Sequence, residues 1–172
     1  NLEEQELPTA NIIVAGITGT GKSTLLNAVF GEEFAKTGVG RPITANMNVY
    51  DSPDIPVRIW DTVGLELDSE KTKDSIREIK NTIIEQSKSK DIFNGIHAIW
   101  YCINAGSSRY QGEELNFIKD LYGVGVPFII VLTQCAQSED EVNGFETKIR
   151  ELNQDNNMGD IEIVRVCAKD FK

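Results

Sequence analysis

The stretch Gly16-Ile-Thr-Gly-Thr-Gly-Lys-Ser23 decides the fold of this 172-residue chain. Its spacing, Gly-x-x-x-x-Gly-Lys-Ser, is typical of a phosphate-binding loop between a strand and a helix. The glycines let successive backbone amides point at a phosphate group, and the positive end of the following helix faces the same anion. Lys22 can reach the outer phosphates, and the Ser23 hydroxyl can ligate Mg²⁺. The expected nucleotide-binding residues of this stretch are Thr18, Gly19, Thr20, Gly21, Lys22, Ser23 and Thr24.

The sequence around this loop has the strand and helix patterns that the loop requires. Residues 11–15 form a short apolar run typical of a buried strand, and residues 22–30 carry apolar side chains at helical spacing. Residues 31–44 hold three glycines and a proline, which predicts a loop. Further strands are predicted at 45–51, 57–60, 96–103, 127–132 and 161–166. Three further helices are predicted. One covers residues 113–122, and the other two each carry apolar side chains on one face. These faces consist of Ile76, Ile79, Ile83 and Ile84 in the first and of Val142, Phe145, Ile149 and Leu152 in the second.

This alternation of strands and helices predicts an α/β domain with a mainly parallel sheet covered on both faces. The connection between strands 45–51 and 57–60 is too short for a crossover helix, so these two strands should be antiparallel. We expect a lead-in segment at residues 1–9 and one domain at 10–172. The chain starts at Asn1 and stops directly after the last strand, so we expect an excised piece of a longer protein without a closing C-terminal helix.

The composition limits the classes of function. Lys and Arg number 17 against 27 Asp and Glu, a formal net charge of −10. This balance argues against non-specific nucleic-acid binding, because a phosphate backbone demands an excess of cations. The apolar runs are far shorter than the roughly 20 residues of a membrane helix. The three cysteines lie far apart without metal-ligand spacing, which predicts a reducing, cytoplasmic setting.

Two shorter motifs follow the loop in a meaningful order. Asp61 ends an apolar strand, where its carboxylate could hold a Mg²⁺-bound water, and the Gly64 amide could approach a γ-phosphate. Thr44 closes a glycine-rich stretch before a strand, where its hydroxyl could complete the Mg²⁺ coordination while a γ-phosphate is present. Each signal alone is weak, since Asp-x-x-Gly is usually a turn and a threonine before a strand is usually a strand former. Their order behind the phosphate loop gives them weight.

With these three elements, the chain resembles the Ras-like GTPases, in particular the Era-like bacterial branch, over residues 11–169. The resemblance implies a three-layer P-loop fold whose six-stranded, mainly parallel sheet has one antiparallel edge strand. It implies GTP or GDP as the bound nucleotide, with Mg²⁺ as cofactor. It also implies that residues 36–44 and 61–80 meet an effector or an activating protein. The implied metal ligands are Ser23, Thr44 and Asp61, and the implied catalytic residues are Lys22, Thr44 and Gly64.

The resemblance extends to the base-binding segments, where the sequence departs from the family. Residues 133–136 occupy the base-reading slot, and residues 167–169 resemble the last base-contacting loop. Gln134 replaces the family's Lys, and Ala136 replaces the Asp that accepts hydrogen bonds from guanine. The implied base contacts are Thr133, Gln134, Ala168 and Lys169.

A nearby carboxylate could take over from the missing Asp. Glu139 and Asp140 are candidates, but Ser138 followed by Glu141 predicts a capping box that places both in the first turn of a helix. Guanine is therefore assigned on resemblance, and an ATP-binding domain of the same fold stays open.

The catalytic pattern is also incomplete. Leu65 stands where many of these GTPases place a water-orienting Gln, and Gly19 stands where potassium-activated relatives carry Asn. Arg41 and Arg109 could stabilise developing charge, although a surface ion pair is the commoner role. We therefore expect a GTP-binding switch with slow hydrolysis of GTP to GDP. A non-hydrolysing regulatory module remains an alternative.

Overall fold

The computed structural model describes residues 7–31, 34, 40–62, 65, 70–107, 110 and 112–166. The elements, in chain order, are β1 (Ala10–Gly16), α1 (Lys22–Phe30), β2 (Arg41–Thr44), β3 (Met47–Ser52), β4 (Ile55–Thr62), α3 (Glu70–Ser87), the 3-10 helix η1 (Ile92–Asn94), β5 (Ile96–Asn104), the 3-10 helix η2 (Ala105–Ser107), α4 (Glu113–Tyr122), β6 (Phe128–Thr133), α5 (Glu139–Asp155) and β7 (Glu162–Val166).

The strands form a single mixed sheet in the order β2-β3-β4-β1-β5-β6-β7. Neighbouring strands from β4 to β7 are parallel, and β3 is antiparallel to both β2 and β4. The predicted α/β fold with its mainly parallel sheet is thus confirmed. The antiparallel strand β3 lies inside the edge, because β2 adds a seventh strand beyond it.

Strand β2 lies in a stretch that the sequence predicted as a loop. Arg41 pairs with Val49 and Thr44 with Met47, so residues 41–44 belong to the sheet. All four residues are exposed, so the sequence lacks the alternation of apolar and polar residues that indicates a half-buried strand. The proline at position 42 is tolerated because an edge strand has one side without hydrogen-bonding neighbours.

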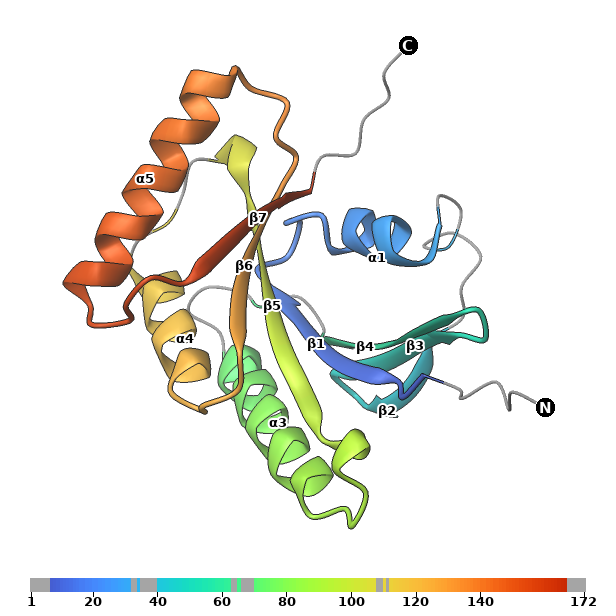
Figure 1. Ribbon diagram of the computed structural model, residues 1–172. Helices are drawn as coiled ribbons and strands as arrows, with labels where there is room; N and C mark the ends of the chain where they lie inside the picture. The colour runs from blue at the N-terminus through green and yellow to red at the C-terminus, as the bar shows by residue number, and fades with distance from the viewer. Residues whose placement is uncertain are drawn as a thin grey trace.

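Helices cover both faces of the sheet (Figure 1). Ile79 of α3, Ile118 of α4 and Ile149 of α5 are fully buried in one apolar cluster with the sheet. Leu25 and Leu26 of α1 belong to a second cluster on the other face. Central strands contact both clusters, which explains their continuous apolar runs. One predicted core position differs, since Ile84 at the end of α3 is 51% exposed.

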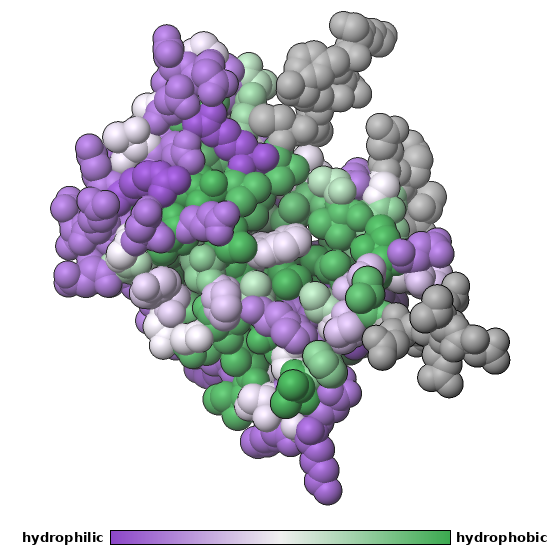
Figure 2. All heavy atoms as spheres, in the orientation of Figure 1, coloured by the Kyte–Doolittle hydropathy of each residue, from purple (hydrophilic) through white to green (hydrophobic). Residues whose placement is uncertain are grey.

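The surface divides into polar and apolar regions. Figure 2 shows hydrophilic residues gathered over α5 and apolar residues over the middle of the sheet. Trp100, Ile129 and Val166 are half-buried against the cluster that contains α1, and Val164 of β7 is 40% exposed. Within the described ranges, no helix has the length and apolar character needed to cross a bilayer.

Candidate functional site

The phosphate-binding pattern forms a tight loop between β1 and α1. Gly19 and Gly21 adopt φ angles of 84° and 79°, in the left-handed region that favours glycine. A Cβ on Gly21 would lie 3.1 Å from the Thr133 hydroxyl, so a larger residue would also crowd β6. Gly21 caps α1 without a side-chain hydrogen bond. The first amides of α1 therefore have no capping side chain, as an anion site at a helix N-terminus requires.

Backbone and side-chain contacts hold this loop from two sides. The amide of Leu65 donates to Gly16 O at 2.9 Å, and the amide of Thr18 donates to Leu65 O at 3.0 Å. From the other side, the Thr133 hydroxyl donates to Thr20 O. The segment after β4 and the end of β6 thus both brace the loop.

The Leu65 side chain is fully buried in the core. The sequence placed Leu65 at the position of a water-orienting residue, and the structure shows a different contribution. Its backbone pairs with the phosphate loop, while its apolar side chain packs into the core.

Lys22 and Asp61 form a largely buried pair beside the loop. The Lys22 ammonium donates to Thr62 O at 2.6 Å and lies 3.8 Å from Asp61 Oδ1. Parallel pairing of Val14 with Asp61 places the carboxylate beside the strand that leads into the loop. Burial lowers the pKa of Lys22 and raises the pKa of Asp61, and the attraction between the two charges opposes both shifts.

Asp61 also fits a Mg²⁺ site. Its Oδ1 is buried and has no hydrogen-bond partner among the described residues, whereas buried polar atoms normally have one. Carboxylate and hydroxyl oxygens are suitable ligands for Mg²⁺. Ser23, the predicted hydroxyl ligand, lies in the first turn of α1 with its side chain exposed.

Thr44 lies in the edge strand β2, against α3. Its hydroxyl donates to Glu78 Oε2 at 2.6 Å and accepts from the amide of Asn46 at 3.1 Å. Asn46 Nδ2 donates to Glu78 Oε1 at 2.9 Å. The structure therefore pairs Thr44 with α3, and its role as a metal ligand stays a prediction. The other predicted functional residues Gly64, Arg109, Ala168 and Lys169 lie outside the described residues.

Gln134 lies over the phosphate loop at the end of β6. Its φ angle is 52°, and its Oε1 accepts a hydrogen bond from Asn104 Nδ2 at 2.8 Å. Its Nε2 lies 3.6 Å from the position of a Cβ on Gly21. Sequence reasoning missed Asn104. The register of β5 and β6 places it directly opposite Thr133, which only the sheet order reveals.

Acidic residues after the base-reading slot are engaged elsewhere. The predicted capping box is confirmed, because Ser138 and Glu141 exchange hydrogen bonds at the start of α5. Glu139 accepts from Arg165 Nη1 at 2.9 Å. The ion pair engages Glu139, and the capping box fixes both Glu139 and Asp140 in the first turn of α5, as the sequence predicted. Arg41 forms a surface ion pair with Asp51 at 3.9 Å, the commoner role expected for it.

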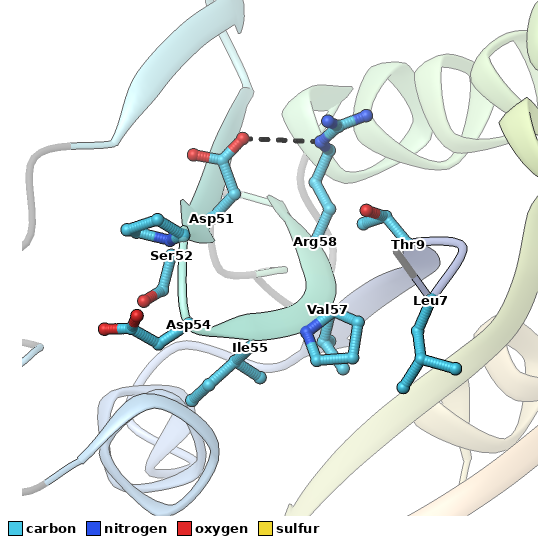
Figure 3. Close-up of a pocket in the computed structure, with 10 residues that line it drawn as sticks. Leu7, Thr9, Asp51, Ser52, Asp54, Ile55, Val57 and Arg58 are labelled. Carbon is cyan, nitrogen blue, oxygen red and sulfur yellow. Dashed lines mark hydrogen bonds and ion pairs between the residues drawn. The ribbon is translucent and has the colours of Figure 1, made fainter. Parts of the chain in front are cut away.

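Two cavities lie at opposite ends of the sheet. Near the loop, a cavity of about 190 Å³ is lined by residues 17–20, Ile103, Asn104, Ser107 and Glu114. A second cavity, of about 620 Å³, surrounds the β3–β4 turn. Figure 3 shows the ion pair of Asp51 and Arg58 at this cavity, and the two interacting atoms lie 3.4 Å apart. That turn precedes β4, whereas Asp61 lies near the end of the same strand. The larger cavity is therefore separate from the phosphate loop.

Glu114 is a titratable residue of the smaller cavity that sequence reasoning missed. It is 5% exposed, and its Oε1 accepts a hydrogen bond from the Tyr101 hydroxyl at 3.1 Å. Burial raises the pKa of Glu114 to about 7, and the hydrogen bond from Tyr101 acts in the opposite direction.

Comparison with known proteins places this site in a family. The tRNA modification GTPase MnmE of Treponema pallidum is 29% identical over 127 residues, covering 71% of this chain and 22% of that protein. GTPase Era of Alkaliphilus oremlandii is 25% identical over 125 residues, covering 72% of this chain and 39% of that protein. The chain therefore spans less than half the length of these relatives.

Solved structures share the fold. The structure of Toc33 from Arabidopsis thaliana in complex with Mg²⁺ and GMPPNP matches with a TM-score of 0.66 and 16% identity, covering 96% of this chain and 73% of that one. The family described as 50S ribosome-binding GTPase matches residues 11–134, which include the phosphate loop, Asp61 and Thr133. The chain belongs to this GTPase family.

Proposed function

We propose that this chain is a Mg²⁺-dependent GTP-binding domain that acts as a molecular switch and hydrolyses GTP to GDP slowly. The observation that carries the proposal is the geometry at Lys22. Its ammonium lies beside a phosphate loop with uncapped helix amides and 3.8 Å from a buried carboxylate oxygen without a hydrogen-bond partner in the described part of the chain. Such a site suits a phosphate anion together with a cation.

Each residue has a distinct role in this proposal. Lys22 and the amides of residues 18–24 would bind the phosphates and stabilise negative charge that develops on the transferring phosphoryl group. Ser23, Asp61 and Thr44 would hold Mg²⁺, which when bound neutralises charge on the phosphate oxygens. Gln134, Ala168 and Lys169 would contact the base, and the fully buried Thr133 would support them through its hydrogen bond to Thr20 O. The Gly64 amide would approach the γ-phosphate.

The expected rate of hydrolysis is low because of Leu65. Its side chain is fully buried, so it cannot orient an attacking water as a glutamine could. This observation also favours a second candidate, a module that binds nucleotide without hydrolysing it.

The switch would involve two segments, residues 36–44 and 61–80. Thr44 would have to leave Glu78, with which it shares a hydrogen bond of 2.6 Å, to reach a metal at the loop. Glu78 lies in α3, so this exchange would couple the γ-phosphate to both segments. We propose that an effector or an activating protein reads these segments and that the protein works in the cytoplasm.

Guanine is preferred over adenine because the chain belongs to a GTPase family. A titration of fluorescent GDP and fluorescent ADP, each with and without Mg²⁺, tests the base and the cation together. We expect tighter binding of GDP and a gain in affinity with Mg²⁺. Equal affinity for the two nucleotides, or a preference for ADP, would exclude the guanine assignment.

Two variants locate the binding site. Lys22→Ala should lower GDP affinity at least about 50-fold, because it removes the cation that meets the phosphates. Asp61→Asn should retain GDP binding without Mg²⁺ but lose the gain that Mg²⁺ brings. Unchanged Mg²⁺ dependence in Asp61→Asn would contradict the metal assignment.

Single-turnover release of phosphate from bound GTP then separates a slow enzyme from a passive switch. We expect a slow release that the Lys22→Ala variant lacks. Bound GTP that stays intact would favour the non-hydrolysing module.

A further inference from the structure

Glu114 is a buried carboxyl group in the first turn of α4. It is 5% exposed and is fixed by the hydrogen bond of 3.1 Å from the Tyr101 hydroxyl of β5. Gly112 caps the helix without a side-chain hydrogen bond. The proposed mechanism gives Glu114 no role, although burial of an ionisable group is costly.

The carboxyl and the phosphate loop share a cavity. The cavity of about 190 Å³ is lined by residues 17–20 of the loop and by Glu114. Ile103 and Asn104 at the end of β5 and Ser107 of η2 line the rest. Since both groups line one small cavity, a charge on Glu114 acts on the loop with weak screening.

Among the residues that the structure describes, the groups that face Glu114 supply no positive charge. Tyr101 and Tyr110 both interact electrostatically with Glu114. Burial raises the pKa of both phenols, so both are neutral near neutral pH. The loop residues and the β5 residues that line the cavity carry no ionisable side chain. Helix α3 presents three cations to α4, namely Lys73, Arg77 and Lys80. They line a different cavity, together with Asn116, Phe117 and Asp120.

A carboxyl group in such a place exchanges its proton near neutral pH. Burial raises the pKa of Glu114 to about 7. A phosphate anion held by the loop would raise that pKa further, because like charges disfavour the ionised form. The neutral form is therefore favoured when the loop holds a nucleotide.

We propose that Glu114 controls the phosphate affinity of the loop, because its neutral carboxyl accommodates the anion and its ionised carboxylate opposes it. Nucleotide binding then takes up a proton at Glu114. By linkage, affinity decreases as the pH rises through neutrality. The inference rests on the proposed function, since it requires a nucleotide at the loop.

The test compares the pH dependence of nucleotide binding in the wild type and in Glu114→Gln. The dissociation constant of fluorescent GDP with Mg²⁺ is measured from about pH 6 to about pH 8.5. Over this range we expect the wild-type constant to rise about three- to tenfold more than that of the variant, as for partial coupling of one proton. Glutamine keeps an oxygen for Tyr101 and cannot ionise. Contributions from Lys22, Asp61 and the nucleotide are common to both proteins.

Asp120→Asn is the matched control, because it removes one negative charge from the side of α4 that faces α3. Its pH profile should follow the wild type. If it flattens like the Glu114→Gln profile, a general charge effect is responsible, and the proposal is overturned.

A second variant, Tyr101→Phe, tests the proposal even if Glu114→Gln does not fold, because the direction in which the pH midpoint moves is predicted. The Tyr101 hydroxyl lowers the pKa of Glu114 by stabilising the ionised form. Tyr101→Phe should therefore move the midpoint of the pH profile upward. A midpoint that stays or moves downward would contradict the proposal.

Calorimetry of GDP binding to the wild type, in buffers of different ionisation enthalpy, gives an independent readout. We expect net uptake of a fraction of one proton near neutral pH. Parallel pH profiles for the wild type and Glu114→Gln would show that Glu114 has only a structural role. That result would overturn this inference without affecting the proposal that the chain binds GTP. Failure of the wild type to bind GDP at any pH would instead overturn the proposed function and the inference together.

Discussion

Lys22, Asp61 and Glu114 are ionisable side chains largely withdrawn from water around one loop. Lys22 and Asp61 oppose each other at 3.8 Å, and each partly offsets the effect of burial on the other. At Glu114, the hydrogen bond from the Tyr101 hydroxyl offsets part of the effect of burial on the pKa. An anion at the loop favours the charged lysine and disfavours both carboxylates. A bound metal ion can offset the repulsion between the anion and Asp61, whereas binding of a proton removes the repulsion at Glu114.

The raised pKa of Glu114 also predicts how stability depends on pH. Its value of about 7 in the folded protein lies above the usual value of about 4.3 for an unfolded chain. The folded state therefore binds the proton more tightly, and this contribution to stability is lost as the pH rises from about 4.3 to about 7. Glu114→Gln should unfold with a free energy about 2–3 kcal/mol higher than the wild type at about pH 8.

Urea denaturation across this pH range measures the difference between the two proteins. It should grow from about pH 5 to about pH 7 and then become constant. A difference that is constant over the whole range would contradict the buried titration of Glu114.

Among the elements, α3 and β2 are joined by one carboxylate. Glu78 accepts from the Thr44 hydroxyl at 2.6 Å and from Asn46 Nδ2 at 2.9 Å, which fixes the β2–β3 turn on the helix. If Thr44 has to leave Glu78 when a γ-phosphate is bound, these contacts favour the GDP state. Helix α3 also contacts α4, so a change in the contact between Thr44 and Glu78 can be passed on to α4.

We therefore predict that Glu78→Ala increases the preference for a GTP analogue over GDP. Two hydrogen bonds to a carboxylate near the surface contribute about 1 kcal/mol in total, which corresponds to about a fivefold change in the ratio of dissociation constants. Titrations with a non-hydrolysable GTP analogue and with GDP measure this ratio. Glu85→Ala is the control, because Glu85 lies on the same helix and pairs with Lys88 at 2.8 Å. An equal ratio in both variants would contradict a specific role of Glu78.

The start of α5 depends on the capping box of Ser138 and Glu141. Ser138→Ala removes the acceptor for the Glu141 amide and should lower the free energy of unfolding by about 1 kcal/mol. For a domain of this size, the expected decrease in melting temperature is about 2–4 °C. Thr147→Ala is the control, since its hydroxyl donates to Asn143 O within the helix and caps no amide. A loss as large in the control would show that the box is not the cause.

For the whole molecule, the sequence predicted the features that repeat along the chain. Continuous apolar runs indicated β1, β5 and β6, and helical spacing indicated α3, α4 and α5. The phosphate loop was predicted because its chemistry is contained in consecutive residues. The approach of Asp61 to the loop was predicted, but most other contacts between distant segments were not. The burial of Leu65 and Glu114 and the bond between Asn104 and Gln134 depend on which strands become neighbours. Strand β2 was missed because its exposed residues carry no apolar alternation.

The loop, Asp61 and the end of β6 are braced against one another, so bound nucleotide should stabilise the entire domain. A ligand that binds only the folded state adds about 2.7 kcal/mol of stability at a concentration 100 times its dissociation constant. For a chain of 172 residues, this corresponds to an increase in melting temperature of about 5–10 °C. We predict an increase of this size with GDP and Mg²⁺, and a smaller one with ADP at the same concentration. Lys22→Ala should show no increase, because its loop lacks the ammonium that meets the phosphates. Thermal unfolding followed by circular dichroism measures the effect. An equal increase in the Lys22→Ala variant would place the stabilising nucleotide elsewhere on the molecule, away from the phosphate loop.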